Sequence, residues 1–171
     1  MKKTSGMPKV ICDSSSLIHL AAIGRLSLLH ELFEELTIPA AVWREVVEEG
    51  RGRFGVTEVE ASVRQGWIRI HPVEASLLLR SLKQDLDEGE AEVIALALEL
   101  EAKLVLYENE ARRKAEAFGL QKTGIVGILI RAKVEGRITA LRPELDRLRT
   151  EGGFWIDDEL YRKVLQAVAE E

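Results

Sequence analysis

The chain has 171 residues, of which 46% are hydrophobic and 31% charged, a balance typical of a folded globular domain that excludes a disordered or fibrous protein. Its 24 Lys and Arg residues are outnumbered by 29 Asp and Glu residues, so the net charge is -5 and no overall basic field attracts nucleic acid. A polyanionic partner must therefore be held locally or through a metal ion.

The sequence predicts no membrane span, because it contains no run of about 18 uncharged apolar residues. Asp13 and His19 interrupt the apolar stretch that follows Lys2 and Lys3, so this stretch does not qualify as a secretory signal. The single cysteine, Cys12, cannot form an internal disulfide, and its apolar neighbours predict a small buried side chain. We therefore expect a cytoplasmic protein.

The first half of the chain alternates predicted strands and helices. Residues 9–12 form an apolar strand, and Asp13 and the serines after it offer capping oxygens to a helix. A second helix is predicted around residues 26–33, followed by a strand at 36–38 and a helix from Pro39 through Glu48. A glycine-rich loop at 50–55 and a strand at 67–70 complete this half.

The second half continues the alternation, with a helix at 88–101, a strand at 104–106 and helices at about 110–118 and 125–134. Such alternation indicates an α/β fold with a mainly parallel sheet covered on both faces. The last predicted helix, 157–169, is amphipathic, and its apolar face is expected to pack on the core, with a surface for a partner as the alternative. That face comprises Leu160, Tyr161, Val164, Leu165 and Val168.

Three carboxylates are expected at the carboxyl edge of this sheet, where parallel sheets gather functional side chains. Asp13 follows the first strand directly, and Glu108 follows the strand at 104–106 after one residue. Glu90 begins the helix that leads into that strand, on the same side as apolar residues, whereas Glu92 projects nearly opposite. Glu90 is therefore predicted to point inward, where a carboxylate must be paired, hydrogen-bonded or metal-bound.

Two of these candidate acids also have a simpler structural interpretation. Asp13 and Glu90 can each cap a helix start. Glu45 lies at the border of the apolar stripe of its helix, where a solvated charge is the simpler interpretation, and Glu48 is expected to be exposed.

Basic residues follow the candidate acids. Arg112, Arg113 and Lys114 open the helix just past Glu108, and Arg131 and Lys133 lie on the next helix. Positive side chains beside acids suit a phosphodiester backbone, and a solvated helix face is the alternative. The three histidines lack the spacing of a zinc pair, and neither glycine-rich nucleotide motif is present.

Four stretches together resemble a PIN domain, the fold of the VapC-like toxin ribonucleases: residues 10–20, 32–46, 86–97 and 104–136. The tail at 154–165 is similar to that of a poorly characterised bacterial and archaeal PIN-like group with a C-terminal extension. The resemblance implies a three-layer α/β/α PIN-like domain over residues 1–140 and a helical extension, residues 141–171, packed on the same domain.

The resemblance also implies hydrolysis of single-stranded RNA by acids that bind Mg²⁺ or Mn²⁺. By position these acids are Asp13, Glu45, Glu90 and Glu108, with Asp13, Glu90 and Glu108 as metal ligands and Glu45 acting through a water or as a base. Ser14 or Ser15 would orient the water, and Arg112, Arg113 and Lys114 would contact RNA. A VapC-like toxin would form a homodimer and be neutralised by a small antitoxin protein.

Two departures from the family pattern favour a second hypothesis. Tyr107 stands where the extended group usually has an acid, and Glu90 and Glu108 are longer than the Asp typical of nuclease-type PIN domains. With the negative net charge, Tyr107 favours a PIN-like module that binds nucleic acid or protein without hydrolysis. A receiver-type phosphoacceptor would need an acid pair near the first strand, but only serines follow Asp13.

Overall fold

A computed structural model describes residues 9–50, 53–108, 116 and 118–170 of the chain. Within these residues, five parallel strands form one sheet in the order β3-β2-β1-β4-β5. The strands are β1 (Val10–Cys12), β2 (Leu36–Pro39), β3 (Ile68–His71), β4 (Leu104–Leu106) and β5 (Lys122–Thr123). The predicted α/β fold with a parallel sheet is confirmed.

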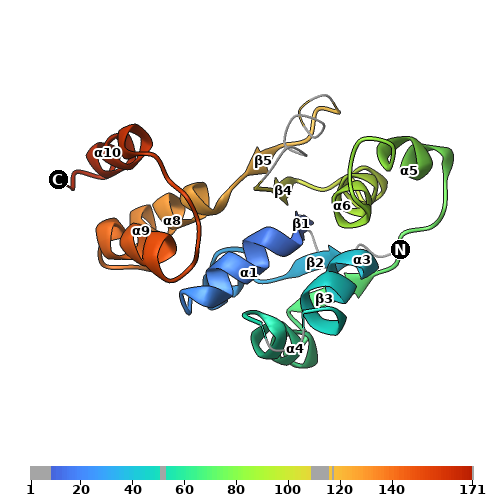
Figure 1. The fold of residues 1–171 in the computed structure, drawn as a ribbon, viewed down its shortest axis with the longest axis horizontal. Coiled ribbons are helices and arrows are strands. Elements are labelled where there is room, and N and C mark those ends of the chain that lie inside the picture. Colours follow the sequence, from blue (N-terminus) through green and yellow to red (C-terminus); the bar gives the residue numbers. More distant parts are fainter. Residues whose placement is uncertain (1–8, 51–52, 109–115, 117, 171) are drawn as a thin grey trace.

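The strand order reverses next to β1, because β2 and β3 lie to one side of it and β4 and β5 to the other. Right-handed crossovers therefore place helices on both faces of the sheet, as Figure 1 shows. The described helices are α1 (Ser14–Ala22), α2 (Ser27–Phe33), α3 (Ala40–Trp43), η1 (Arg44–Glu48), α4 (Val56–Gln65), α5 (Leu77–Leu82), α6 (Glu88–Glu99), α8 (Ile125–Val134), α9 (Leu141–Thr150) and α10 (Asp158–Ala167).

The central strand β1 is buried along its whole length, which explains its continuous apolar sequence. Helix α6 packs against β1 and β2, while α1 contacts α8. Cys12 is fully buried in β1, as predicted. Because the strands are short, the residue after each one already lies at the edge where the chain leaves the sheet.

Some predicted elements differ from the structure. The helix predicted from Pro39 through Glu48 consists of α3 followed by a π-helical turn, η1. In α10 the apolar face is only partly covered: Val164 and Leu165 are buried, but Leu160 is 42% exposed. The prediction that this whole face packs on the core is therefore wrong for Leu160. Helices α4 and α5 and strand β5 were not predicted, whereas α9 lies within the helical extension expected over residues 141–171 although its bounds were not predicted.

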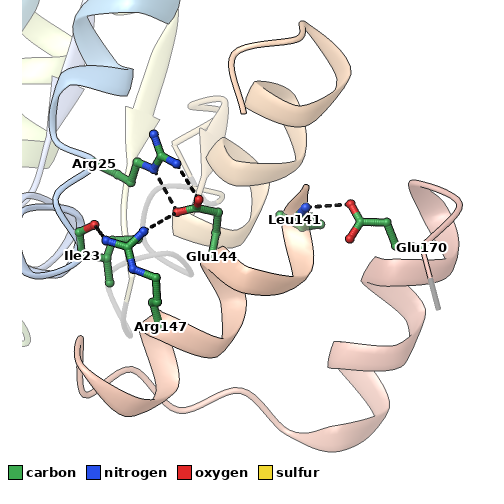
Figure 2. A network of polar contacts seen from close by, with 6 residues as sticks. All are labelled: Ile23, Arg25, Leu141, Glu144, Arg147 and Glu170. Atoms are coloured by element: carbon green, nitrogen blue, oxygen red, sulfur yellow. Dashed lines mark hydrogen bonds and ion pairs between the residues drawn. The ribbon is translucent and has the colours of Figure 1, made fainter. Parts of the chain in front are cut away.

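The last two helices are attached to the rest of the protein through polar contacts (Figure 2). The buried carboxylate of Glu144 in α9 accepts hydrogen bonds from Arg25 Nε at 2.9 Å and Nη2 at 2.6 Å. Arg147 donates to the carbonyl of Ile23. The contacts of Glu144 and Arg147 hold α9 against the turn between α1 and α2. At the start of α9, the Glu170 carboxylate accepts the N–H of Leu141 at 2.6 Å, which ties the residues after α10 to α9.

No single described helix is long and apolar enough to cross a membrane; α1 and α2 meet the length and composition criteria only as a pair bent by 116°.

Candidate active site

Asp13 lies at the carboxyl end of β1 and is only 3% exposed. Its Oδ1 accepts the N–H of Ser16 at 2.9 Å, which caps α1, and its Oδ2 accepts the N–H of Glu108 at 3.1 Å. Burial raises the pKa of Asp13, and the hydrogen bonds from Ser16 and Glu108 partly offset that rise. Asp13 therefore caps a helix and also joins the ends of two neighbouring strands.

The serines after Asp13 differ in their surroundings. Ser14 Oγ donates to Glu45 Oε1 at 3.4 Å. Ser15 is partly exposed at the start of α1. The Ser16 hydroxyl is buried beside Asp13, whose pKa it lowers, yet it has no hydrogen bond of acceptable geometry to any described group.

Glu45 is half-buried in η1, with its Oε1 so close to Gly89 that a side chain there would collide with it. Burial, together with the charge of Asp87, raises the pKa of Glu45 from its ordinary 4.5 to about 7. In the described ranges, no basic side chain forms an ion pair with Asp13 or Glu45. The simpler interpretation of Glu45 as a solvated surface charge is therefore wrong.

Glu90 forms a capping box at the start of α6. Its N–H donates to Asp87 Oδ1 at 2.8 Å, and its Oε1 accepts the N–H of Asp87 at 3.2 Å. The capping interpretation is therefore correct, and Glu90 is only partly buried.

The prediction that Glu90 points inward and Glu92 points outward is wrong. Glu92 is only 6% exposed and accepts the N–H of Ala41. Helix α6 packs against α3 and α5 as well as the sheet, and two of its sides are therefore covered.

Glu108 follows β4 and reaches the start of α8, where its Oε2 accepts the N–H of Ile125. Gly124 lies so close that an added Cβ would be 2.6 Å from the same oxygen.

Tyr107 is fully buried, and its hydroxyl donates to the backbone carbonyl of Glu90 at 3.1 Å. Burial raises the pKa of Tyr107, and the charges of Asp13, Glu90 and Asp87 add to the rise.

These contacts connect all four predicted acids at one edge of the sheet. Asp13 bonds the backbone of Glu108, Ser14 bonds Glu45, and the charge of Glu90 contributes to the raised pKa of Glu45. As the side chains lie, no three acid, histidine or cysteine groups of the described residues are close enough to hold a metal ion. The donor chemistry nevertheless fits a hard divalent cation, since these are carboxylates and two of them lack a described basic partner.

The model of a known family, described as a PIN domain, matches residues 9–170. The chain belongs to the PIN domain family. This match supports a nuclease fold, and PIN domains generally use divalent metal ions. A search of the curated proteins finds no match.

The basic residues proposed to face RNA are not all near the acids of this PIN domain. Arg112, Arg113 and Lys114 lie outside the described residues. Arg131 and Lys133 are in the last turn of α8, whereas Glu108 bonds the first turn of that helix. Arg131 also pairs with Glu135 and lies over the ring of Phe33. Arg131 and Lys133 are therefore at the wrong end of α8 to support the acids.

Sequence reasoning missed Glu92 as a neighbour of the site. A charged residue between Ala91 and Val93, within a helix whose other central residues are apolar, was the available signal. The helical projection placed Glu92 on a polar face, because sequence does not show that a second helix covers that face. The contact of Tyr107 with Glu90 was likewise not predictable, because it depends on the distance between β4 and α6.

Proposed function

We propose that this PIN domain is a metal-dependent endoribonuclease that hydrolyses phosphodiester bonds in single-stranded RNA with Mg²⁺ or Mn²⁺. The observation that carries the proposal is the pair Asp13 and Glu45, a buried and a half-buried carboxylate that have raised pKa values and form no ion pair with a described basic side chain. Carboxylates in this state are costly to a fold unless a cation or a reaction uses them.

Asp13, Glu90 and Glu108 would hold the cation. A bound divalent ion orients a water, lowers its pKa and stabilises charge on the phosphate oxygens. Asp13 is already oriented by the N–H groups of Ser16 and Glu108, while Glu90 and Glu108 each accept a backbone N–H, from Asp87 and Ile125, through one carboxylate oxygen. Glu45 has a pKa of about 7 and can accept a proton near neutral pH. Ser14, which donates to Glu45, would keep that carboxylate aimed at the attacking water.

The test is cleavage of a labelled single-stranded RNA by purified protein with Mn²⁺ or with EDTA. Asp13→Asn and Glu45→Gln are each expected to lower the rate by at least about a hundredfold. Glu48→Gln is the matched control, because Glu48 lies on the same helix but is exposed, and its rate should equal that of the wild type. Cleavage that is unaffected by EDTA and by Asp13→Asn would contradict the proposal and indicate a contaminating nuclease.

We propose in addition that the protein is a VapC-like toxin, acting in the cytoplasm as a homodimer and neutralised by a small antitoxin protein. The family resemblance supports this role. Growth arrest on expression, absent for Asp13→Asn and relieved by the product of a short reading frame immediately upstream, is the expected result. Light scattering of the purified protein measures the dimer. Equal growth of cells expressing the wild type and Asp13→Asn would count against a toxin.

A binding module without hydrolysis is the second candidate. Tyr107 replaces a family acid and is fully buried against the Glu90 backbone, and Glu90 and Glu108 are engaged in helix capping. For this candidate, retention of a labelled single-stranded RNA without cleavage, equal in Mn²⁺ and in EDTA, is the expected result. Metal-dependent cleavage that is lost in Asp13→Asn would exclude it.

A further inference from the structure

Helix α3 begins without a cap from its own segment. Pro39 occupies the N-cap position, and its side chain offers no hydrogen bond to the first turn. The N–H of Ala41 instead donates to Glu92 Oε1 at 3.0 Å, and Glu92 comes from the middle of α6. A carboxylate at a helix start satisfies a free N–H and interacts favourably with the helix dipole.

The two helices joined by this bond both carry acids of the proposed site. The helical segment 40–48, comprising α3 and η1, carries Glu45, and α6 carries Glu90. The segment also meets α6 where Glu45 Oε1 lies against Gly89. Two contacts, one at the start of α3 and one at Glu45, therefore set how the segment lies on α6.

We propose that Glu92 is a positioning residue for Glu45. Its carboxylate caps α3 from α6 and so fixes the distance and rotation of the segment that presents Glu45 to Asp13 and Glu90. This inference rests on the proposed function insofar as Glu45 acts in catalysis. Nothing in it requires Glu92 itself to contact metal or RNA.

The burial of Glu92 supports a specific role. At 6% exposure a carboxylate is costly, and the surrounding residues of α6 are apolar, so an apolar side chain would pack there at lower cost. What an apolar side chain cannot supply is an acceptor for the Ala41 N–H.

Two substitutions of Glu92 distinguish its role as a hydrogen-bond acceptor from the effect of its negative charge. Glu92→Gln keeps an amide oxygen in the same place, whereas Glu92→Met has a similar length and flexibility but accepts no such bond. Glu92→Ala is a second apolar variant that cannot overpack the site. Glu99→Gln is the matched control, because Glu99 lies on the same helix α6 but is exposed.

Hydrogen exchange of segment 40–48, affinity for Mn²⁺ alone and RNA cleavage are measured on the full chain of each variant. Glu92→Met and Glu92→Ala should exchange faster in segment 40–48 but not in α9. Their kcat should fall about tenfold or more with KM for RNA unchanged, because Glu45 is displaced, whereas their affinity for Mn²⁺ should equal that of the wild type, because Glu45 is not one of the proposed metal ligands. Glu92→Gln should restore wild-type exchange and kcat, and Glu99→Gln should leave exchange in segment 40–48 at the wild-type rate.

Unchanged exchange of segment 40–48 in both apolar variants would overturn the proposal. So would a loss of cleavage in Glu92→Gln as large as that in Glu92→Met, because the charge and not the cap would then matter. If the wild type neither binds Mn²⁺ nor cleaves RNA, the proposed function fails, and the exchange of segment 40–48 still decides whether Glu92 holds Glu45 in place.

Discussion

The carboxyl group of Glu45 lies in surroundings that favour its neutral form. Burial and the charge of Asp87 raise its pKa from an ordinary 4.5 to about 7, so the folded protein binds this proton more tightly than the unfolded chain does. The resulting stabilisation is complete below pH 4.5 and is lost as the pH rises through 7. Above pH 7, the ionised Glu45 is a source of instability.

Glu45→Gln is therefore expected to raise the melting temperature at pH 8. After allowance for the screening of a half-buried group, the gain is about 1 kcal/mol, or about 2–4 °C for a protein of this size. The gain should shrink between pH 7 and pH 4.5. Differential scanning fluorimetry in metal-free buffer at several pH values measures it, with Glu48→Gln as the exposed control. A gain that does not change with pH would contradict the raised pKa.

Gly124 provides a test of Glu108. Its backbone has φ of -121°, so alanine is conformationally allowed, but the added Cβ would lie 2.6 Å from Glu108 Oε2. Gly124→Ala should displace that carboxylate and lower Mn²⁺ affinity about tenfold while leaving the fold intact. Gly127→Ala in the same helix approaches Thr123 Oγ1 instead and serves as the control. Equal Mn²⁺ affinities, measured by titration calorimetry, would show that Glu108 does not hold the ion.

For single residues, the sequence predicts the place of an acid in the site when that acid directly follows the end of a strand. Asp13 and Glu108 each follow a strand, and the two strands are neighbours, so their proximity is a property of the parallel sheet. The proximity of Glu45, Glu90 and Glu92 depends on how two helices pack, and helical periodicity alone does not contain that information. Glu45 was accordingly assigned only through the family resemblance.

At the scale of elements, the buried strands and the apolar helices were predictable, and the polar or very short elements were not. Strands β1 and β4 and helix α8 stand out because they are almost continuously apolar. Helix α9 has Leu141, Leu145 and Leu148 on one buried face, but charged residues surround them and Pro143 lies in its first turn. Strand β5 has only two residues, too few for any alternating pattern.

Helix α9 depends on Glu144 for its attachment, because this buried carboxylate bonds both Arg25 and Arg147. Glu144→Gln should destabilise the protein by about 2 kcal/mol, since an amide cannot accept both bonds from Arg25 as a carboxylate does. Urea unfolding followed by circular dichroism measures the change. Glu151→Gln, at the exposed end of the same helix, should be neutral. A loss of less than about 0.5 kcal/mol would show that the ion pair is replaceable.

For the whole molecule, the predicted division at residue 140 leads to a direct test. The family model runs through this boundary to residue 170, and Leu141, Leu145 and Leu148 are part of the continuous core. A protein ending at residue 140 should therefore lose cooperative unfolding, because it exposes this core and leaves Arg25 without Glu144. Near-ultraviolet circular dichroism and thermal unfolding measure the outcome. A cooperative transition at the full-length midpoint would show that residues 1–140 are an independent domain.

The central place of β1 in the sheet has a consequence for synthesis on the ribosome. Of the described strands, the one that leads to Asp13 comes first in the chain, whereas the N–H of Glu108, which follows the neighbouring strand β4, comes 95 residues after Asp13. Glu108 in turn requires the start of α8 at Ile125. A nascent chain that ends before Ile125 has no complete acidic edge, so the proposed ribonuclease would stay inert towards its own messenger until that residue has been made.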